Sequence, residues 1–234
     1  MRRLTEVKAA NREINAARCF YRTADLACRW YDVRHSINVR YRSDHKAATR
    51  RRIVDAASQA FRERGVAETG VDEVMRKAGL THGGFYAHFR DKSELIAEAC
   101  ESAFAAAVEN LERIAGLPTA AKRARLLIDS YLSTHHRDHR GTGCLVVSVG
   151  ADISRYSGAV LSRYSHGFTS HLNRLCAALR LSADAVENED RVTHLMSALV
   201  GALIFARAVD DPKRSDALLV SSRRMLRREF CSSP

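Results

Sequence analysis

The sequence is poor in residues that interrupt helices, and it has no long apolar run. Its 234 residues include three prolines, and aromatic residues make up 7% of the chain. This scarcity favours a helical protein over a β-sheet protein. No run of about 18 consecutive apolar residues occurs, and the opening Met-Arg-Arg is not followed by an apolar segment. We therefore expect no membrane span and no secretory signal, and hence a cytoplasmic protein.

The sequence also lacks the ligand spacing of a metal site, so we expect neither a metal nor another cofactor. The cysteines are scattered without close pairs, and the cytoplasm would keep them reduced. They are Cys19, Cys28, Cys100, Cys144, Cys176 and Cys231. His135, His136 and His139 could share one helical face, but the only further ligand nearby is Asp138 and two arginines flank the group. We interpret this cluster as a solvated helix end.

The net charge of +11 is concentrated near the N-terminus. Residues 1–52 contain 14 Lys and Arg against 5 Asp and Glu. Such asymmetry favours a polyanionic partner, and nucleic acid is favoured over a membrane because no strongly amphipathic basic helix is evident.

Residues 1–42 show no sustained apolar period, so we expect a basic, poorly ordered extension. One alternative is an arm that contacts phosphates nonspecifically. Another is that translation starts at Val39, read from an alternative start codon. Mass spectrometry of the protein made from its own promoter tests the second alternative, which an N-terminus upstream of Val39 contradicts.

From Ser43 the spacing of apolar residues becomes helical. The first predicted helix begins with three arginines, including Arg50, that form a basic edge, and it ends at Gly65. Its apolar face consists of Ile53, Ala57, Ala60 and Phe61.

Two shorter helices are predicted next. One covers 71–78, with Thr69 or Gly70 as its cap, and the other covers about 82–89, with Thr81 as its cap. Two short helices joined by a tight turn are typical of a helix-turn-helix, which binds DNA.

The rest of the chain predicts a larger helical domain. We expect helices over 92–116, 120–134, 144–153, 158–181, 190–209 and 213–230. The fold class is therefore all-α, with an extension over 1–42, a three-helix DNA-binding domain over 43–91 and a larger helical domain over 92–234. The penultimate helix has a wide apolar face that we assign to a homodimer interface: Val192, Leu195, Met196, Leu199, Leu203 and Ala206.

Residues 49–95 carry a full series of characteristic positions: Ile53, Ala56, Ala57, Phe61, Gly65, Val71 to Val74, Ala78-Gly79-Leu80-Thr81, Gly83, Tyr86, His88-Phe89, Lys92 and Leu95. This series resembles the DNA-binding domain of the tetracycline-repressor (TetR) family of bacterial regulators. The resemblance implies a homodimeric repressor that binds a palindromic double-stranded DNA operator and is released by a small-molecule effector.

The resemblance also implies individual roles. Thr81 and Lys92 would contact phosphates, His82 with Gly83 would enter the major groove, and Tyr86 would position the DNA backbone. The full set of expected DNA-binding residues is Arg50, Thr69, Gly70, Thr81, His82, Gly83, Gly84, Tyr86, His88 and Lys92. The family often has a small side chain where this chain has Gly84, so we expect weaker direct base readout.

The resemblance implies that residues 92–234 form a ligand-binding and dimerisation domain, in which the effector would bind. Phe104, Tyr131, Phe168 and His171 are candidate pocket residues, with plain core packing as the alternative. The segment Gly143-Cys144-Leu145 resembles one found in a branch of the family that includes electrophile-sensing repressors. Cys144 is therefore either a reactive sensor or a buried structural cysteine.

Two other functions compete with a ligand-responsive repressor. A nonspecific or architectural DNA-binding protein would use the basic N-terminal region and would show little sequence preference. A small helical enzyme would use Cys144 or a histidine, but no nucleophile, base and orienting residue form a recognisable set. We therefore expect a regulator and not an enzyme.

Overall fold

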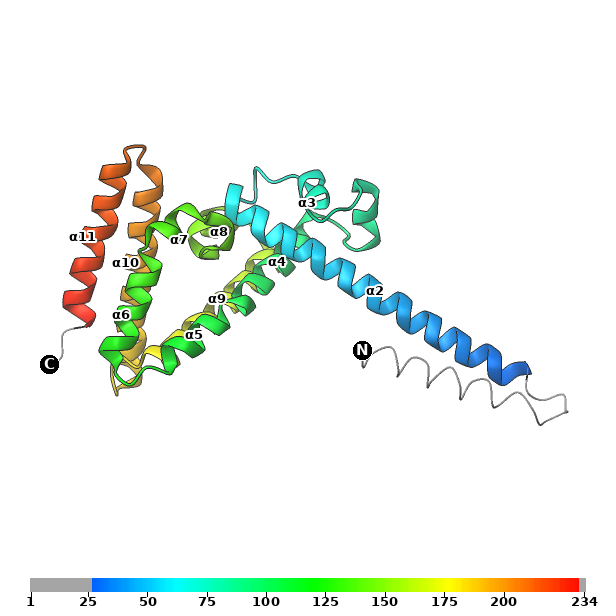
Figure 1. The fold of residues 1–234 in the computed structure, drawn as a ribbon, viewed down its shortest axis with the longest axis horizontal. Coiled ribbons are helices and arrows are strands. Elements are labelled where there is room, and N and C mark those ends of the chain that lie inside the picture. The colour runs from blue at the N-terminus through cyan, green and yellow to red at the C-terminus, as the bar shows by residue number, and fades with distance from the viewer. Residues whose placement is uncertain (1–26, 232–234) are drawn as a thin grey trace, which may run out of the picture. The chain divides into compact units, whose positions relative to one another are not determined.

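The computed structural model describes the backbone of residues 27–231 and the side chains of residues 44–107 and 111–231 (Figure 1). Contacts divide the chain into two units, Met1–Ala47 and Ala48–Pro234, and the features described below belong to the second. The described part is helical throughout, which confirms the all-α prediction. The elements are α2 (Ala27–Arg64), α3 (Val71–Lys77), the 3-10 helix η1 (His82–Ala87), α4 (Lys92–Ala106), α5 (Val108–Ala115), α6 (Ala120–Tyr131), α7 (Thr134–Asp138), the 3-10 helix η2 (Arg140–Thr142), α8 (Leu145–Ile153), α9 (Gly158–Leu179), α10 (Ala185–Ala208) and α11 (Pro212–Phe230).

Three elements differ from their predicted form. Helix α2 begins at Ala27 rather than near Ser43, because residues 27–52 contain neither Gly nor Pro and a helix can continue there without an apolar face. Residues 1–26 of the expected extension lie outside the described residues. The third predicted helix is the shorter 3-10 helix η1, whose two adjacent glycines disfavour an α-helix. The helix predicted over 92–116 is divided at Ala107, whose N–H bonds to the carbonyl of Phe104, three residues earlier.

The first part of unit two is a compact head built from the end of α2, α3, η1 and the start of α4. Gly65, with a φ of 86°, ends α2 in a backbone conformation that favours glycine. The largest fully buried side chains of the head are Ile53, Phe61, Met75, Phe85, Phe89, Leu95 and Ile96. The predicted apolar face of α2 is therefore confirmed as the core of this head.

Unit two contains two separate hydrophobic cores. One joins the head to α4, α8 and the start of α9, and the other joins α5, α6, α10 and α11 with the end of α9. Helix α8 contributes to both, because Leu145, Val149 and Ile153 lie in the first core while Cys144 and Val147 pack against the second. This helix is therefore placed between the head core and the core of the last two helices.

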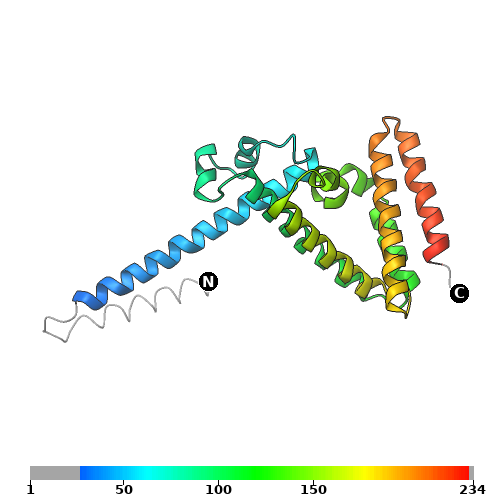
Figure 2. The same ribbon diagram turned by 180° about the vertical axis from the view of Figure 1, so that it is seen from behind.

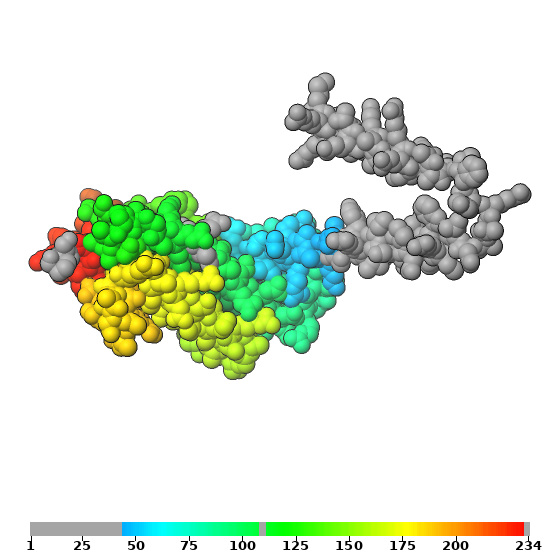
Figure 3. Space-filling view, turned by 90° about the horizontal axis from the view of Figure 1, so that it is seen from below, coloured from blue at the N-terminus to red at the C-terminus, as the bar shows by residue number. Residues whose placement is uncertain are grey.

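Helix α9 packs along α4 and α5, as Figures 1 and 2 show from opposite sides. Seen from below, α9 forms a broad strip of surface in yellow and yellow-green (Figure 3). Helices α4 and α9 approach closely at Gly167, where an added Cβ would lie 2.6 Å from Cδ2 of Phe104. Phe104 is itself 8% exposed, so its ring has little room to withdraw.

Helices α10 and α11 lie side by side, joined at Asp211, whose side chain accepts a hydrogen bond from the Lys213 N–H at 3.0 Å. Helix α10 is long and apolar enough to cross a membrane by length and composition alone, but the same is true of core helices in soluble proteins. Its apolar face is indeed buried against the rest of the chain. The packing of α10 is therefore that of a core helix.

The structure corrects the predicted dimer interface. All six assigned residues are buried within the chain's own second core, between 0% and 8% exposed, because α10 needs that face to pack on α9 and α11. They are Val192, Leu195, Met196, Leu199, Leu203 and Ala206. The large apolar side chains that α10 and α11 leave exposed are instead Val186, Ile204, Phe205, Val220 and Met225.

The close approach at Gly167 generates a stability prediction. Gly167→Ala should lower the free energy of unfolding by about 1–3 kcal/mol, because the new methyl group meets the buried ring of Phe104. Urea denaturation measures this value. Phe104→Leu makes room for the methyl group, so the double variant should be less destabilised than the two single variants summed. A gain of up to about 1 kcal/mol in Gly167→Ala, as helix propensity alone predicts, would contradict the packing described.

Candidate nucleic-acid interface

Residues 81–89, called the recognition segment below, are anchored from one side only. Phe85 and Phe89 are 1% and 2% exposed, and their rings stack with centroids 5.5 Å apart. Tyr86, between them, is 67% exposed. The segment thus exposes the Tyr86 side chain to solvent, while the Phe85 and Phe89 rings on either side anchor it in the core.

The exposed side of the recognition segment also carries Thr81, His82 and Gly83. Thr81 occupies the cap position of η1, but its side chain makes no capping hydrogen bond, contrary to the prediction. The hydroxyl is therefore free to bind a partner. The His82 ring meets the Tyr86 ring edge-on at 6.0 Å, and its Nδ1 pairs with the carboxylate of Asp72 at the start of α3.

Gly84 plays a different role from the one predicted. An added Cβ there would point at Cε of Met75, 3.6 Å away, and at the hydroxyl of Thr81, 3.9 Å away. A side chain at this position would therefore face α3, and its absence removes nothing from the exposed surface. Gly83 is the open position, since an added Cβ would meet nothing within 4 Å.

Thr69 is a structural residue and not a surface residue. It is 0% exposed, and its hydroxyl donates to the carbonyl of Gly65 at 2.7 Å, which fixes the turn after α2. Its burial rules out the predicted DNA contact. The neighbouring Gly70 is exposed and holds the cap position of α3.

Arg50 also departs from its predicted role. Its guanidinium is bound to Glu94 and Glu98 of α4 and lies 4.1 Å from the centroid of the Phe89 ring. The spacing of the sequence already indicates that Arg50 points inward. It lies three and seven residues before the buried Ile53 and Ala57, on the same face of the helix. The exposed arginines of this basic edge are Arg51 and Arg52, which were predicted as part of the edge but not among the individual DNA-binding residues.

The two remaining predicted contacts flank the end of the recognition segment. His88 is half-buried, and its carbonyl accepts a hydrogen bond from Arg50. The Lys92 ammonium donates to the carbonyl of Val66 at 2.8 Å, so it ties α4 to the turn after α2. That bond uses one of its three N–H donors, which leaves the charge available to a nearby phosphate.

Three predicted effector residues, Phe104, Phe168 and His171, lie in one aromatic cluster, whereas the Tyr131 ring contacts His136 and belongs to the second core. The Phe104 ring is 5.9 Å from that of His171 and 5.4 Å from that of Tyr164, which stacks in parallel on Phe168 at 6.5 Å. Burial, followed by the neighbouring Cys144, raises the pKa of both Tyr131 and Tyr164. Cys144 packs against the second core, to which Tyr131 belongs.

Several polar atoms in and beside this cluster are buried without a hydrogen-bond partner of normal geometry among the described residues: the Tyr131 hydroxyl, Ser148 Oγ and His171 Nδ1. Such atoms are costly unless something binds them. The prediction missed Tyr164 and Ser148. Tyr164 could have been found from its spacing, because it lies four and seven residues before Phe168 and His171 on one helical face.

Cys144 lies at the cap position of α8, where a histidine holds its backbone. Its N–H donates to His136 Nε2 at 2.9 Å, while His136 Nδ1 lies 2.7 Å from the carbonyl of Tyr131. His136 is therefore the neutral tautomer that carries its proton on Nδ1. Burial is the main cause that lowers the pKa of His136, which keeps this arrangement neutral.

The three neighbouring histidines do not converge on a metal. His136 faces α8, whereas the rings of His135 and His139 stack on each other at 4.0 Å. Over the part of the chain that the structure describes, no three His, Cys, Asp or Glu side chains are grouped as ligands.

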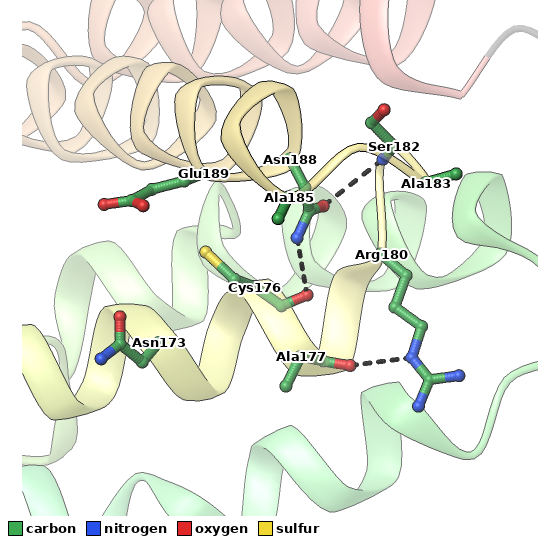
Figure 4. A pocket seen from close by; sticks show the side chains of 9 residues that line it. All are labelled: Asn173, Cys176, Ala177, Arg180, Ser182, Ala183, Ala185, Asn188 and Glu189. Carbon is green, nitrogen blue, oxygen red and sulfur yellow. Dashed lines mark hydrogen bonds between the residues drawn. The ribbon is translucent and has the colours of Figure 1, made fainter.

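A shallow surface pocket of about 350 Å³ lies where α9 turns into α10 (Figure 4). Asn188 fills the centre of this turn, accepting from the Leu181 N–H at 2.7 Å and donating to the Cys176 carbonyl at 3.1 Å. Arg180 is turned outward and bonds to the carbonyl of Ala177 at 3.2 Å. These bonds account for the polar groups as structural, and none of the predicted effector residues lines this pocket.

Comparison with known proteins identifies the head. The sequence model described as "Bacterial regulatory proteins, tetR family" matches residues 53–99. The transcriptional regulator AcrR of Shigella flexneri is 43% identical over 53 residues, which cover 23% of this chain and 25% of AcrR. The match thus spans only about a quarter of that relative. The transcriptional repressor Rv1474c of Mycobacterium tuberculosis is 28% identical over 179 residues, or 75% of this chain and 91% of that protein.

Solved structures share the fold of about four fifths of this chain. The reduced form of NemR from E. coli superposes with a TM-score of 0.66 at 21% identity, covering 80% of this chain and 98% of NemR. FadR from Bacillus subtilis, solved in complex with stearoyl-CoA, gives 0.57 at 19% identity, covering 75% and 96%. At these identities the likeness concerns the fold alone.

The two threonines of the head allow a matched test. Thr69→Val should lower the free energy of unfolding by about 1–3 kcal/mol, because the Gly65 carbonyl loses its buried donor. Thr81→Val should change it by less than about 0.5 kcal/mol, because this exposed side chain makes no capping bond. Thermal or urea unfolding of the two variants measures both changes. Equal losses of unfolding free energy would contradict the buried placement of the Thr69 hydroxyl and the exposed placement of the Thr81 hydroxyl.

Proposed function

We propose that this chain is a homodimeric repressor of the tetR family of bacterial transcriptional regulators, which binds a palindromic operator through its helix-turn-helix head and is released by a small-molecule effector. The observation that carries this proposal is the recognition segment, which presents Tyr86, His82 and the free Thr81 hydroxyl from a buried aromatic base.

We assign the operator contact to this exposed side. A short helix with an open Gly83 can approach the floor of the major groove, where His82 would read base edges. Tyr86 and Thr81 would bind flanking phosphates. Arg51 and Arg52 replace Arg50 as phosphate contacts from α2, and Lys92 adds its charge beside the positive end of α4.

The effector would bind at the aromatic cluster of Phe104, Tyr164, Phe168 and His171. Two observations support this position. The cluster lies where the two hydrophobic cores meet, and it includes or adjoins the buried His171 Nδ1 and Ser148 Oγ, for which the described residues supply no hydrogen-bond partner. An effector that offers hydrogen bonds to those atoms would gain affinity by satisfying them.

Cys144 borders the same cluster and supports a second trigger. Modification of its sulfur by an oxidant or electrophile would enlarge a side chain packed against the core that contains Tyr131. The alternative that Cys144 is structural predicts that Cys144→Ser leaves every response of operator binding unchanged.

Helix α8 would carry the signal to the head. At its far end, Asp152 accepts a hydrogen bond from the N–H of Val66 at 3.0 Å, and Arg62 donates to the carbonyl of Gly141 just before α8 at 2.7 Å. An effector must bind the state that cannot bind DNA more tightly, and each 1.4 kcal/mol of difference weakens operator affinity about tenfold.

The dimer would form through the exposed faces of α10 and α11. Ile204 and Phe205 are 43% and 63% exposed, and Val220 and Met225 are 52% and 54% exposed. Apolar side chains exposed together on two adjacent packed helices are a suitable surface for a second copy related by twofold symmetry.

The competing function, nonspecific DNA coating, differs in its salt dependence and sequence preference. A coating protein binds through phosphates alone and loses most of its affinity as salt rises. A regulator keeps a large ratio between operator and unrelated DNA at physiological salt, on the order of a thousandfold or more.

Tyr86 provides the direct test of the operator contact. Tyr86→Ala should weaken binding to the operator, found upstream of its own or neighbouring genes, by about tenfold, the effect of losing one hydrogen bond to a charged phosphate. Tyr86→Phe should lose a similar amount if the hydroxyl makes the contact. Gel-shift titration measures both, and unchanged affinity in both variants would place the DNA contact elsewhere.

The dimer surface is tested by charge. Phe205→Glu should shift the protein from dimer to monomer in sedimentation experiments and weaken operator binding, because two carboxylates would face each other across the twofold axis. Leu161→Glu is the matched control, since Leu161 is an exposed apolar residue on α9. A dimer that persists in Phe205→Glu but is lost in Leu161→Glu would move the interface to α9.

A further inference from the structure

One guanidinium joins three elements of the head. Arg50 of α2 donates from Nε to Glu98 at 3.0 Å and from NH2 to Glu94 at 2.9 Å, and both carboxylates belong to the first turns of α4. From NH1 it donates to the carbonyl of His88, at the end of the recognition segment. Its plane lies over the Phe89 ring at 4.1 Å. We call Arg50, Phe89, Glu94, Glu98 and the His88 carbonyl the Arg50 clasp.

The clasp engages every nitrogen of the Arg50 guanidinium. Nε and NH2 bind the two carboxylates and NH1 binds the His88 carbonyl, while Glu94 also pairs with Arg90 Nε at 3.3 Å. The hydrogen bond to Glu98 is the main cause that raises the pKa of Arg50. The fork formed by Nε and NH2 is therefore occupied by carboxylates and is not open to a phosphate.

Glu94 also makes a second hydrogen bond that connects α4 to the end of the recognition segment. It accepts the backbone N–H of Arg90 at 2.9 Å, directly after the recognition segment. That bond, followed by the one from Arg50, lowers the pKa of Glu94 to about 2, so the carboxylate stays charged under ordinary conditions. The connection between the recognition segment and α4 is therefore held directly by Glu94 at Arg90 and through Arg50 at the His88 carbonyl.

The recognition segment needs such support. A 3-10 helix of six residues with two adjacent glycines has poor hydrogen-bond geometry and high backbone freedom, and its cap residue makes no side-chain bond. Apart from the buried packing of Phe85 and Phe89, the clasp is what joins the end of this segment to α2 and α4 together.

We propose that Arg50 is a positioning residue for operator recognition, which fixes the recognition segment on α4 through Glu98 and the His88 carbonyl without touching DNA itself. The inference rests on the proposed operator-binding function. It adds that α4 and the recognition segment move as one body, so that any change in α4 reaches the DNA contacts.

The two possible roles of Arg50, neutralising a phosphate or positioning the recognition segment, make opposite predictions for variants of the clasp. If Arg50 neutralised a phosphate, its removal would make the slope of log K against log salt shallower by about 0.9, and removal of the Glu98 charge would strengthen binding. If Arg50 only positions the segment, its removal weakens operator binding at an unchanged slope, and removal of the Glu98 charge also weakens it.

The experiment is fluorescence anisotropy of the full chain with an operator duplex and a scrambled duplex across a NaCl series. We expect Arg50→Ala to bind the operator roughly tenfold more weakly and Glu98→Gln several-fold more weakly, with both slopes unchanged and with scrambled-duplex affinity within about twofold of wild type. Arg51→Ala, an exposed neighbour, is the control and should make the slope shallower.

Two results would overturn the inference: a shallower slope in Arg50→Ala, or operator binding in Glu98→Gln as tight as wild type or tighter. Glu98→Gln is a mild change at a half-exposed carboxylate, and thermal unfolding checks that it remains folded, so the test stands even if Arg50→Ala does not fold. If the wild-type protein itself prefers no sequence, the proposed repressor function fails, an outcome distinct from either of these results.

Discussion

The head depends on holding a very short recognition segment in place. Six residues of 3-10 helix with two glycines have little stability of their own. Two buried phenylalanines anchor the segment from below, and the Arg50 clasp fixes its end to α2 and α4. Because Phe85 and Phe89 provide this anchorage, the outward side chains of Thr81 and Tyr86 remain available for DNA, while His82 pairs with Asp72 through Nδ1.

The second constraint is the division of the helical domain into two cores. The head shares one core with α4 and α8, while α10 and α11 share the other, and α8 borders both. His136 holds the first residues of α8 from α7, and Asp152 near its end holds the turn after α2. Arg207 of α10 in turn bonds to the carbonyl of His136 at 2.8 Å. A hydrogen-bonded route therefore runs from the last helices to the head, through the region where the effector is proposed to bind.

Helix periodicity predicted most of the fold, because apolar spacing directly reports which face of a helix is buried. It gave the order of the helices and the core of the head, including Ile53 and Phe61. It could not distinguish a face buried within the chain from one buried by a partner. The apolar face of α10 satisfied both interpretations, and only the packing of α9 and α11 against it assigns Leu195 and Leu199 to the chain's own core.

Polar residues were harder to place, because their roles depend on partners that are distant in sequence. Arg50 finds its carboxylates 44 and 48 residues later, and Thr69 finds a carbonyl across a turn. Both look like surface residues in sequence. Tyr86 was placed correctly at the surface because its neighbours Phe85 and Phe89 take the inward positions. Gly84 was misjudged because only the fold shows that its missing side chain would face Met75.

The central claim is that two such heads read one operator, and hydroxyl-radical footprinting of the DNA upstream of the protein's own and neighbouring genes tests it most directly. The account predicts two symmetric protected half-sites about one helical turn apart, since a twofold dimer places its heads on one face of the duplex. Uniform protection without symmetry or a preferred sequence would contradict it.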